Sequence, residues 1–364
     1  MLDDSSTDYE IVKATLAVGD QLVYTHGDGW RVIASDGTTK TGATGGGISD
    51  GDKGDITVTG SGATWTIDNA TITHDKLATA FRKQLAQSQD FRLTLTSGAP
   101  VTTSDVTAAG TIYACPYNGN AIALYDGTNW NIRTSAEFSL ALSGLTSGKP
   151  YDVFCYDNSG TPTLEFLVWT NDTTRATALT YQDGVLVKSG AATRRYLGTF
   201  YTTGTTTTED SAAKRFLYNY YYRVERPLIA ALETTNTWTY TTNTWRQANA
   251  NAANQLDFVL GVAEDAVFAH ASTSARNGTA QQEAYVGIGL DSTSANSATL
   301  MPNANIFFSG THHVALNAEY IGTPSAGRHY LAWLEIDVTA TGTTTWLGDN
   351  GGITLSRIHG MMKG

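Results

Sequence analysis

The chain has 364 residues, 16% of them charged, and its formal net charge is −11. This length allows two or three domains with cores of their own. An acidic surface repels phosphate backbones, which argues against nucleic acid as a partner. No apolar run approaches the roughly 18 residues needed to cross a bilayer, and the polar start at residues 1–10 does not resemble a signal peptide. We therefore expect assembly in a cytoplasm, without membrane insertion.

Residue usage favours strands. The chain holds 36 Gly but only 7 Pro, and about one residue in six is Thr. Thr, Val, Ile and aromatic residues fit a pleated, half-buried surface, whereas helix formers such as Glu and Lys are scarce. The composition predicts an all-β protein with many short strands. Cys115 and Cys155 lie far apart among apolar residues, which favours two buried free thiols over a disulfide.

The first 43 residues hold short strand-like runs, at 21–24 and 30–33, separated by clusters of turn residues. Each run is too short to be stable alone. Residues 1–43 are therefore predicted to form a small β unit that docks on another protein.

Residues 44–74 are rich in Gly and Asp and contain two strand-like runs, 56–59 and 64–67. In these runs Ile56, Val58, Trp65 and Ile67 alternate with small polar residues. The pattern gives one narrow apolar face, which a single chain of this length buries poorly and several copies wrapped together bury well.

Residues 75–89 are the clearest helix candidate. Leu77, Phe81 and Leu85 recur at four-residue spacing, which predicts a helix with a thin apolar stripe. Such a stripe is typical of a seam between identical helices. Together with the preceding face, it predicts a shaft over residues 44–90 in which several copies of the chain pack together.

The rest of the chain reads as two β-sandwich domains, at residues 91–227 and 228–364. In the first, turn signals recur every 8–12 residues, and Asp157–Gly160 between two apolar runs is a strong hairpin signal. Residues 214–224 fit a helix or a strand, and their tyrosines favour a strand. In the second, about eight strand-like runs, including 305–308 and 353–355, predict a jelly-roll-like domain. Its Asn-rich and Ser-rich stretches, 249–254 and 272–279, are read as loops.

Aromatic residues supply one candidate binding site. Trp238, Tyr240 and Trp245 stand among Thr and Asn, a pattern that fits either a sugar-stacking surface or a core.

Catalytic and metal chemistry have weaker candidates. Two carboxylates at the right separation are enough for a glycan depolymerase, and Glu335 and Asp337 share a strand face. No motif singles out a pair, so we predict no catalytic residues and no enzyme. The other acids considered are Glu264, Asp265, Glu283, Asp291 and Glu319. The histidines are scattered; His74 on a threefold axis is the one metal candidate considered, and a solvated His is favoured. We predict no metal and no cofactor.

A resemblance appears at residues 46–77. The run Gly-Gly-Ile-Ser-Asp-Gly-Asp-Lys-Gly-Asp-Ile-Thr-Val-Thr, followed by Gly-Ala-Thr-Trp-Thr-Ile-Asp and Ile-Thr-His-Asp-Lys-Leu, resembles a shaft motif common in fibre and adhesin proteins of tailed bacteriophages. The stretch 93–228 resembles a module of phage virion proteins. Its landmarks are Ser-Gly-Lys-Pro-Tyr-Asp-Val-Phe (147–154), Leu-Glu-Phe-Leu-Val-Trp (164–169), Gln-Asp-Gly-Val-Leu-Val-Lys (182–188) and Arg-Arg-Tyr-Leu-Gly-Thr-Phe (194–200).

This resemblance implies a homotrimer in the virion, attached to other virion proteins through residues 1–43 and presenting its C-terminal part outward. A tail fibre or receptor-binding protein that contacts a glycan or protein of the host surface is the expected function. A head fibre or capsid decoration protein is an alternative, and a glycan-depolymerase tailspike is a second. The sequence does not place the protein on head or tail, nor does it name a receptor or host.

Overall fold

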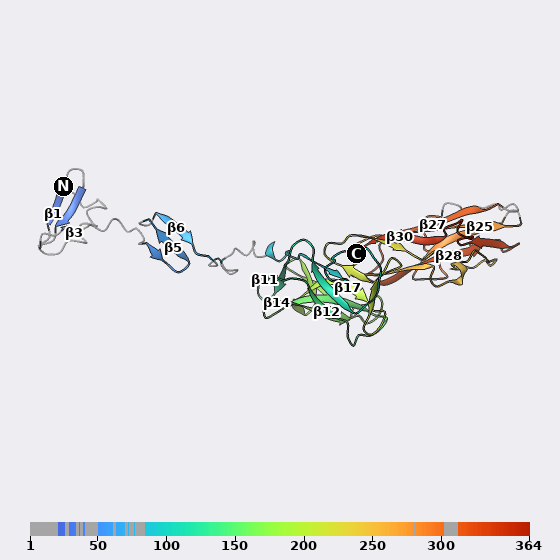
Figure 1. Ribbon diagram of the computed structural model, residues 1–364, viewed down its shortest axis with the longest axis horizontal. Coiled ribbons are helices and arrows are strands. Elements are labelled where there is room, and N and C mark those ends of the chain that lie inside the picture. The colour runs from blue at the N-terminus through green and yellow to red at the C-terminus, as the bar shows by residue number, and fades with distance from the viewer. Residues whose placement is uncertain are drawn as a thin grey trace. The chain divides into compact units, whose positions relative to one another are not determined.

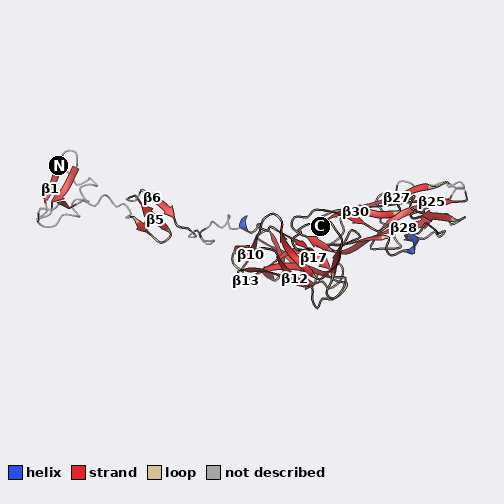
Figure 2. Cartoon of the chain, in the orientation of Figure 1, coloured by secondary structure: helices blue, strands red, loops and turns tan. Residues whose placement is uncertain are grey.

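The structure is a computed structural model that describes residues 21–25, 29–33, 36, 39–40, 50–60, 63–69, 72, 76, 84–279, 282–301 and 312–364. Within these ranges the chain is all-β, which confirms the predicted fold class (Figure 1, Figure 2). It divides into two compact units, Met1–Leu77 and Ala78–Gly364. The finer division into four parts stays a prediction.

The smaller unit contains two antiparallel three-stranded sheets, and the predicted runs at 21–24, 30–33, 56–59 and 64–67 all lie in them. The strands are β1 (Gln21–Thr25), β2 (Gly29–Ile33) and β3 (Thr39–Lys40), then β4 (Gly51–Asp52), β5 (Ile56–Thr59) and β6 (Thr64–Ile67).

Most of the predicted helix at 75–89 lies outside the described residues, as do Leu77 and Phe81. Within the described part, Gln84 and Leu85 are helical and are followed by a turn.

In the larger unit, the first sandwich pairs a three-stranded with a six-stranded sheet. The three-stranded sheet has the order β12-β9-β7, and the other has the order β14-β13-β17-β16-β15, with β20 also on β17. Buried side chains from both sheets, such as Leu93, Ile112, Val153 and Phe200, form one hydrophobic cluster. The strands are β7 (Phe91–Thr94), β9 (Thr111–Pro116), β12 (Phe138–Ala141), β13 (Pro150–Asn158), β14 (Thr161–Val168), β15 (Leu179–Gln182), β16 (Val185–Lys188), β17 (Ala191–Tyr201) and β20 (Leu217–Asn219), beside the hairpin of β10 (Ala121–Tyr125) and β11 (Trp130–Thr134).

The predicted hairpin at Asp157–Gly160 is confirmed. Asn158 of β13 pairs with Thr161 of β14, so the turn has two central residues, Ser159 and Gly160. Both have positive φ, 52° and 94°. Two residues in the left-handed region give a turn whose twist matches that of the flanking strands. The local sequence therefore fixes the register of the two long strands.

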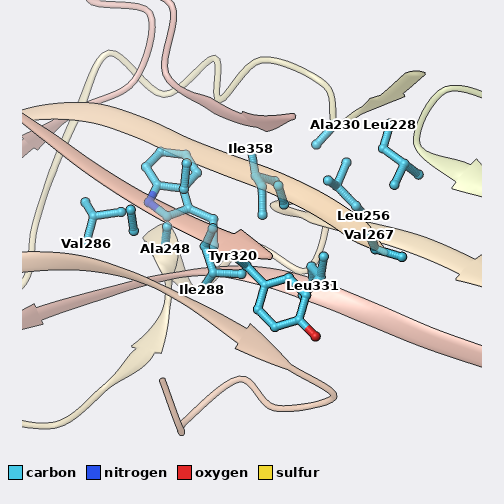
Figure 3. Packing of buried hydrophobic residues seen from close by; sticks show 14 of the residues in the cluster. Leu228, Ala230, Ala248, Leu256, Val267, Val286, Ile288, Tyr320, Leu331 and Ile358 are labelled. Carbon is cyan, nitrogen blue, oxygen red and sulfur yellow. The ribbon is translucent and has the colours of Figure 1, made fainter. Parts of the chain in front are cut away.

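A second sandwich packs a seven-stranded sheet against a six-stranded sheet. Figure 3 shows Leu256, Ile288 and Leu331 of the first sheet packed with Val267 and Ile358 of the second. The seven-stranded sheet comprises β8 (Val106–Ala109), β18 (Thr208–Asp210), β19 (Lys214–Arg215), β23 (Arg246–Gln247), β24 (Gln255–Leu260), β26 (Ala284–Leu290) and β28 (Gly327–Asp337). The six-stranded sheet comprises β21 (Glu225–Ile229), β22 (Thr237–Thr239), β25 (Val267–Asn277), β27 (Val314–Gly322), β29 (Thr344–Leu347) and β30 (Arg357–Lys363).

Strands from both sandwich regions share the seven-stranded sheet. β19 pairs in parallel with β24, and Arg215 lies opposite Phe258. β8, β18 and β19 thereby extend a sheet whose other strands begin at Arg246. The two sandwiches are thus joined by backbone hydrogen bonds as well as by the chain.

Two predictions about the C-terminal region are wrong. The supposed loop at 272–279 is mostly β25, whose buried positions here are the small residues Thr273, Ala275 and Asn277. The supposed strand at 353–355 is part of a turn, in which the Thr354 N–H donates to the Asp349 carbonyl oxygen at 2.9 Å.

Two further expectations concern 214–224 and 305–308. The strand reading of 214–224 holds for β19 and β20, whereas residues 220–224 lie outside any strand. The run 305–308 lies outside the described residues.

Candidate functional site

The predicted shaft face is visible in β5 and β6. Ile56 lies opposite Ile67, and Val58 lies opposite Trp65. Side chains alternate along a strand and directly opposed residues share a face, so all four lie on one face of this small sheet. Val58 is fully buried, whereas Trp65 and Ile67 are 53% and 57% exposed. The role of this face of the sheet as a trimer seam stays a prediction.

The last residue of the predicted seam, Leu85, belongs to the larger unit. Leu85 is half-buried, and the next residue, Ala86, is fully buried in a cluster with Trp130, Val185 and Val187. The chain that enters the larger unit is therefore packed firmly on it from Ala86 onward.

The three aromatic residues predicted to bind sugar have different surroundings. Trp238 in β22 is only 8% exposed, and its ring meets Trp333 edge-on with centroids 6.0 Å apart. A ring enclosed in this way offers no open face to a sugar. Tyr240 and Trp245 are half-buried, and the Arg246 guanidinium covers one face of Tyr240 at 3.8 Å from the ring centre. The sugar-binding prediction therefore rests on Tyr240 and Trp245 alone.

A buried carboxylate, Glu335, organises the segment that carries these rings. Trp238 Nε1 donates to Glu335 Oε2 at 2.7 Å, and Arg246 Nε and the Asn249 N–H donate to Oε1 at 2.8 and 3.1 Å. Burial raises the pKa of Glu335 to about 7, against the opposing effect of these donors. Asn249 has a φ of 55°, so its hydrogen bond stabilises a backbone conformation that few residues adopt.

A second glutamate, Glu233, holds the neighbouring Asn-rich loop. Its carboxylate accepts from the side-chain amides of Asn251 and Asn254 at 2.9 and 2.8 Å and from the Thr235 N–H at 3.0 Å. Burial opposes ionisation, yet these hydrogen bonds lower the pKa of Glu233 to about 2. Hydrogen bonds to the charged Glu233 carboxylate therefore hold the loop at 249–254 in one conformation.

The carboxylates considered for glycan hydrolysis have structural roles. Glu335 and Asp337 are both fully buried, and Asp337 accepts from Thr344 Oγ1 at 2.6 Å and from the Ala340 N–H at 2.9 Å. Neither reaches a surface where a substrate would bind. The others contact neighbours: Glu264 and Asp265 bind Arg223, Glu283 accepts from Tyr285, Asp291 faces His329 and Glu319 faces His270.

The two cysteines have the surroundings that the sequence predicts. Cys115 and Cys155 are buried and free, as predicted, and burial raises the pKa of their thiols to about 11 and about 12. His74 lies outside the described residues. In the part of the chain that the structure describes, no group of three or more His, Cys, Asp or Glu is arranged to hold a metal. Among the same residues, no helix has the length and apolar character that crossing a bilayer requires.

Two arginines, buried Arg195 and half-buried Arg175, make structural contacts that the sequence does not reveal. Arg195 Nη1 donates to the carbonyl oxygens of Ala86, Ser88 and Ala123 at 2.8 to 3.0 Å, and so fastens the entering segment to the larger unit. Arg175 binds Asp152 through Nε and Nη2 at 2.8 and 3.2 Å. Arg195 lies within the largely apolar β17 and Arg175 lies between β14 and β15, and neither setting in the sequence identifies the partners.

Comparisons with known proteins give no family. No family model matches the chain, and no curated protein matches it. Two solved structures of infectious bursal disease virus, the Gt and Gx strains, are each 9% identical. They align over 76% and 71% of this chain and over 77% and 74% of their own, with TM-scores of 0.24 and 0.22. A Bacillus thuringiensis Cry1Da tryptic core variant is 8% identical over 66% of this chain and 48% of its own, with a TM-score of 0.15. Similarities this low carry no functional argument.

Proposed function

We propose that this chain is a structural fibre protein of a tailed-bacteriophage virion, of the tail-fibre or receptor-binding kind. It assembles as a homotrimer, is fixed to other virion proteins through residues 1–43, and contacts the host surface with its C-terminal part. The observation that carries the proposal is the exposed pair Trp65 and Ile67, because it lies within the segment that resembles a fibre shaft motif.

Covering the exposed area at this face would contribute to assembly. Full burial of an Ile side chain is worth about 1.5–3 kcal/mol, so covering the exposed part of Ile67 contributes about 1–2 kcal/mol. A Trp buries about 150–250 Å², and covering the exposed half of Trp65 contributes about 2–3 kcal/mol. Three chains would gain about 9–15 kcal/mol at most, before the entropy lost on association is subtracted.

The larger unit suits an outward role. Its long strands form a rigid scaffold, and buried Glu233 and Glu335 hold the loop segment between β22 and β24 in one conformation. Loops that a rigid scaffold positions are where binding residues tend to lie. No catalytic step forms part of the proposal.

The test uses a phage deleted for this gene and complemented with the full chain or with a chain lacking residues 1–43. Gold-labelled antibody against the larger unit should mark the tails of particles that carry the full chain. The truncated chain should still be trimeric but be missing from purified particles by mass spectrometry. Label on DNA-filled heads would instead favour the head-fibre alternative, and clearing of a polysaccharide lawn by the purified protein would favour the depolymerase. Truncated chain at full copy number would contradict attachment through residues 1–43.

A further inference from the structure

A groove of about 460 Å³ opens on the larger unit, and Trp238, Tyr240 and Trp245 are not among the residues that line it. Its lining comes from the stretch 169–186 and from a segment after β24, which are brought together by the fold. Its polar and aromatic lining includes Trp169, Thr173, Thr174, Arg175, Tyr181 and Glu264. The volume falls in the range of small-molecule sites, about 300–1,000 Å³.

One wall of the groove is an exposed aromatic ring. Tyr181 in β15 is 63% exposed, and the same groove is lined by buried Leu186 and by half-buried Leu179 and Val262, which pack together. Tyr181 and Leu179 are two residues apart on the strand and therefore face the same way. A large ring left open above an apolar base offers a flat surface for stacking.

The polar groups of the groove favour a neutral ligand. Arg175 Nε and Nη2 donate to the Asp152 carboxylate, Nη2 also donates to the Gly261 carbonyl oxygen, and the guanidinium lies 4.2 Å from the centre of the Trp169 ring. The Asp152 carboxylate therefore already balances the charge of Arg175, which weakens its attraction for an anion. The Glu264 carboxylate, held by Arg223 Nη2 at 2.8 Å, is the charged group at the rim. The Glu264 carboxylate can accept hydrogen bonds from the hydroxyl groups of a ligand. Thr173 and Thr174 are exposed, and their hydroxyls can both donate to and accept from such groups.

We propose that this groove binds a neutral pyranose sugar. An apolar face of the sugar ring stacks on Tyr181, while its hydroxyls donate to Glu264 and exchange hydrogen bonds with the threonine hydroxyls. Glu264 and the neighbouring Asp265 share one cation, Arg223, so a net negative charge remains beside the rim. It disfavours sugars with carboxylate or sulfate groups, because like charges at close range repel. This inference rests on the proposed function, since it names the class of host-surface ligand, and it places the site on residues other than the predicted Trp238, Tyr240 and Trp245.

The experiment is saturation-transfer NMR on the full chain with methyl glycosides of glucose, galactose, mannose and N-acetylglucosamine as probes. At least one glycoside should give a signal with the native chain and with Tyr181→Phe, which keeps the ring. Tyr181→Ala should weaken binding about tenfold, as removal of a contact worth about 1.4 kcal/mol does. Tyr117→Ala removes another exposed tyrosine, outside the groove, and should bind like the native chain.

Two results would overturn the groove assignment. Either no glycoside binds the native chain, or Tyr181→Ala binds a glycoside as tightly as the native chain does. Because Tyr181 is largely exposed, its replacement should leave the fold intact, which circular dichroism of the same samples checks. The mass of each sample in solution gives its oligomeric state, which tests the fibre proposal separately from sugar binding. A trimer without sugar binding contradicts the groove alone, whereas a monomer that binds sugar contradicts the fibre alone.

Discussion

The ion pair of Arg175 with Asp152 gives a sharp test of the larger unit. Asp152 is only 1% exposed, and its carboxylate is held by Arg175 and by Thr199 Oγ1 at 2.7 Å. Arg175→Met leaves this carboxylate buried without a cation, which costs about 3–5 kcal/mol. For a unit of this size, the melting temperature should fall by about 5–8 °C.

The effect should depend on pH in a definite direction. Burial raises the pKa of Asp152 even with Arg175 beside it, and loss of the cation removes an effect that lowers the pKa. A carboxyl whose pKa is higher in the folded state favours folding at low pH, and this contribution is lost as pH rises through the folded-state value. The penalty of Arg175→Met should therefore be smaller at pH 5 than at pH 8.

Chemical denaturation of both single variants and of the double variant Asp152→Asn with Arg175→Met provides the assay. The double variant removes both charges and should recover part of the stability that Arg175→Met loses. A loss below about 1 kcal/mol for Arg175→Met, the value typical of exposed pairs, would refute the view that this pair is buried and essential. Equal penalties at pH 5 and pH 8 would refute the role assigned to Asp152.

Three more outcomes are expected. Replacing Trp65 and Ile67 together by Ser should weaken the trimer by several kcal/mol, within the limit of about 9–15 estimated above, and leave the larger unit folded; sedimentation at falling concentration measures this, and unchanged association would contradict the shaft face. Because burial raises the pKa of Glu335 to about 7, the stability that it contributes should be present at pH 4 and decline as pH rises through 7, and Glu335→Gln should flatten that decline in denaturation curves. Trp238→Phe removes a hydrogen bond to Glu335 and should cost about 1.5–3 kcal/mol, whereas Tyr240→Phe, a matched change at a half-buried ring, should cost less.

Local chemistry explains where the sequence predicted structure well. Ser159 and Gly160 between two apolar runs specify a two-residue turn, so the β13–β14 hairpin could be read directly. Strands rich in large residues, such as β28, were also visible. β25 was missed because its buried positions are mostly Ala, Thr and Asn, so the alternation carries little contrast in hydrophobicity.

The candidate site was harder to predict because its decisive contacts are distant in sequence. Trp238 stands among Thr and Asn as an exposed sugar-binding Trp would, yet Glu335, which binds its indole N–H, is 97 residues away. In the same way, Tyr181 is exposed beside a groove completed by Val262 and Glu264. A local pattern indicates which side chains can stack on a ligand, and the fold decides which of them remain accessible.

The mass of the purified full chain in solution tests the central claim most directly. Our proposal is that copies of the chain cover the exposed Trp65 and Ile67 on the predicted shaft face of β5 and β6. Sedimentation equilibrium at micromolar concentration should therefore give three times the chain mass of 38.9 kDa. A stable species with the mass of one chain would contradict the trimeric fibre.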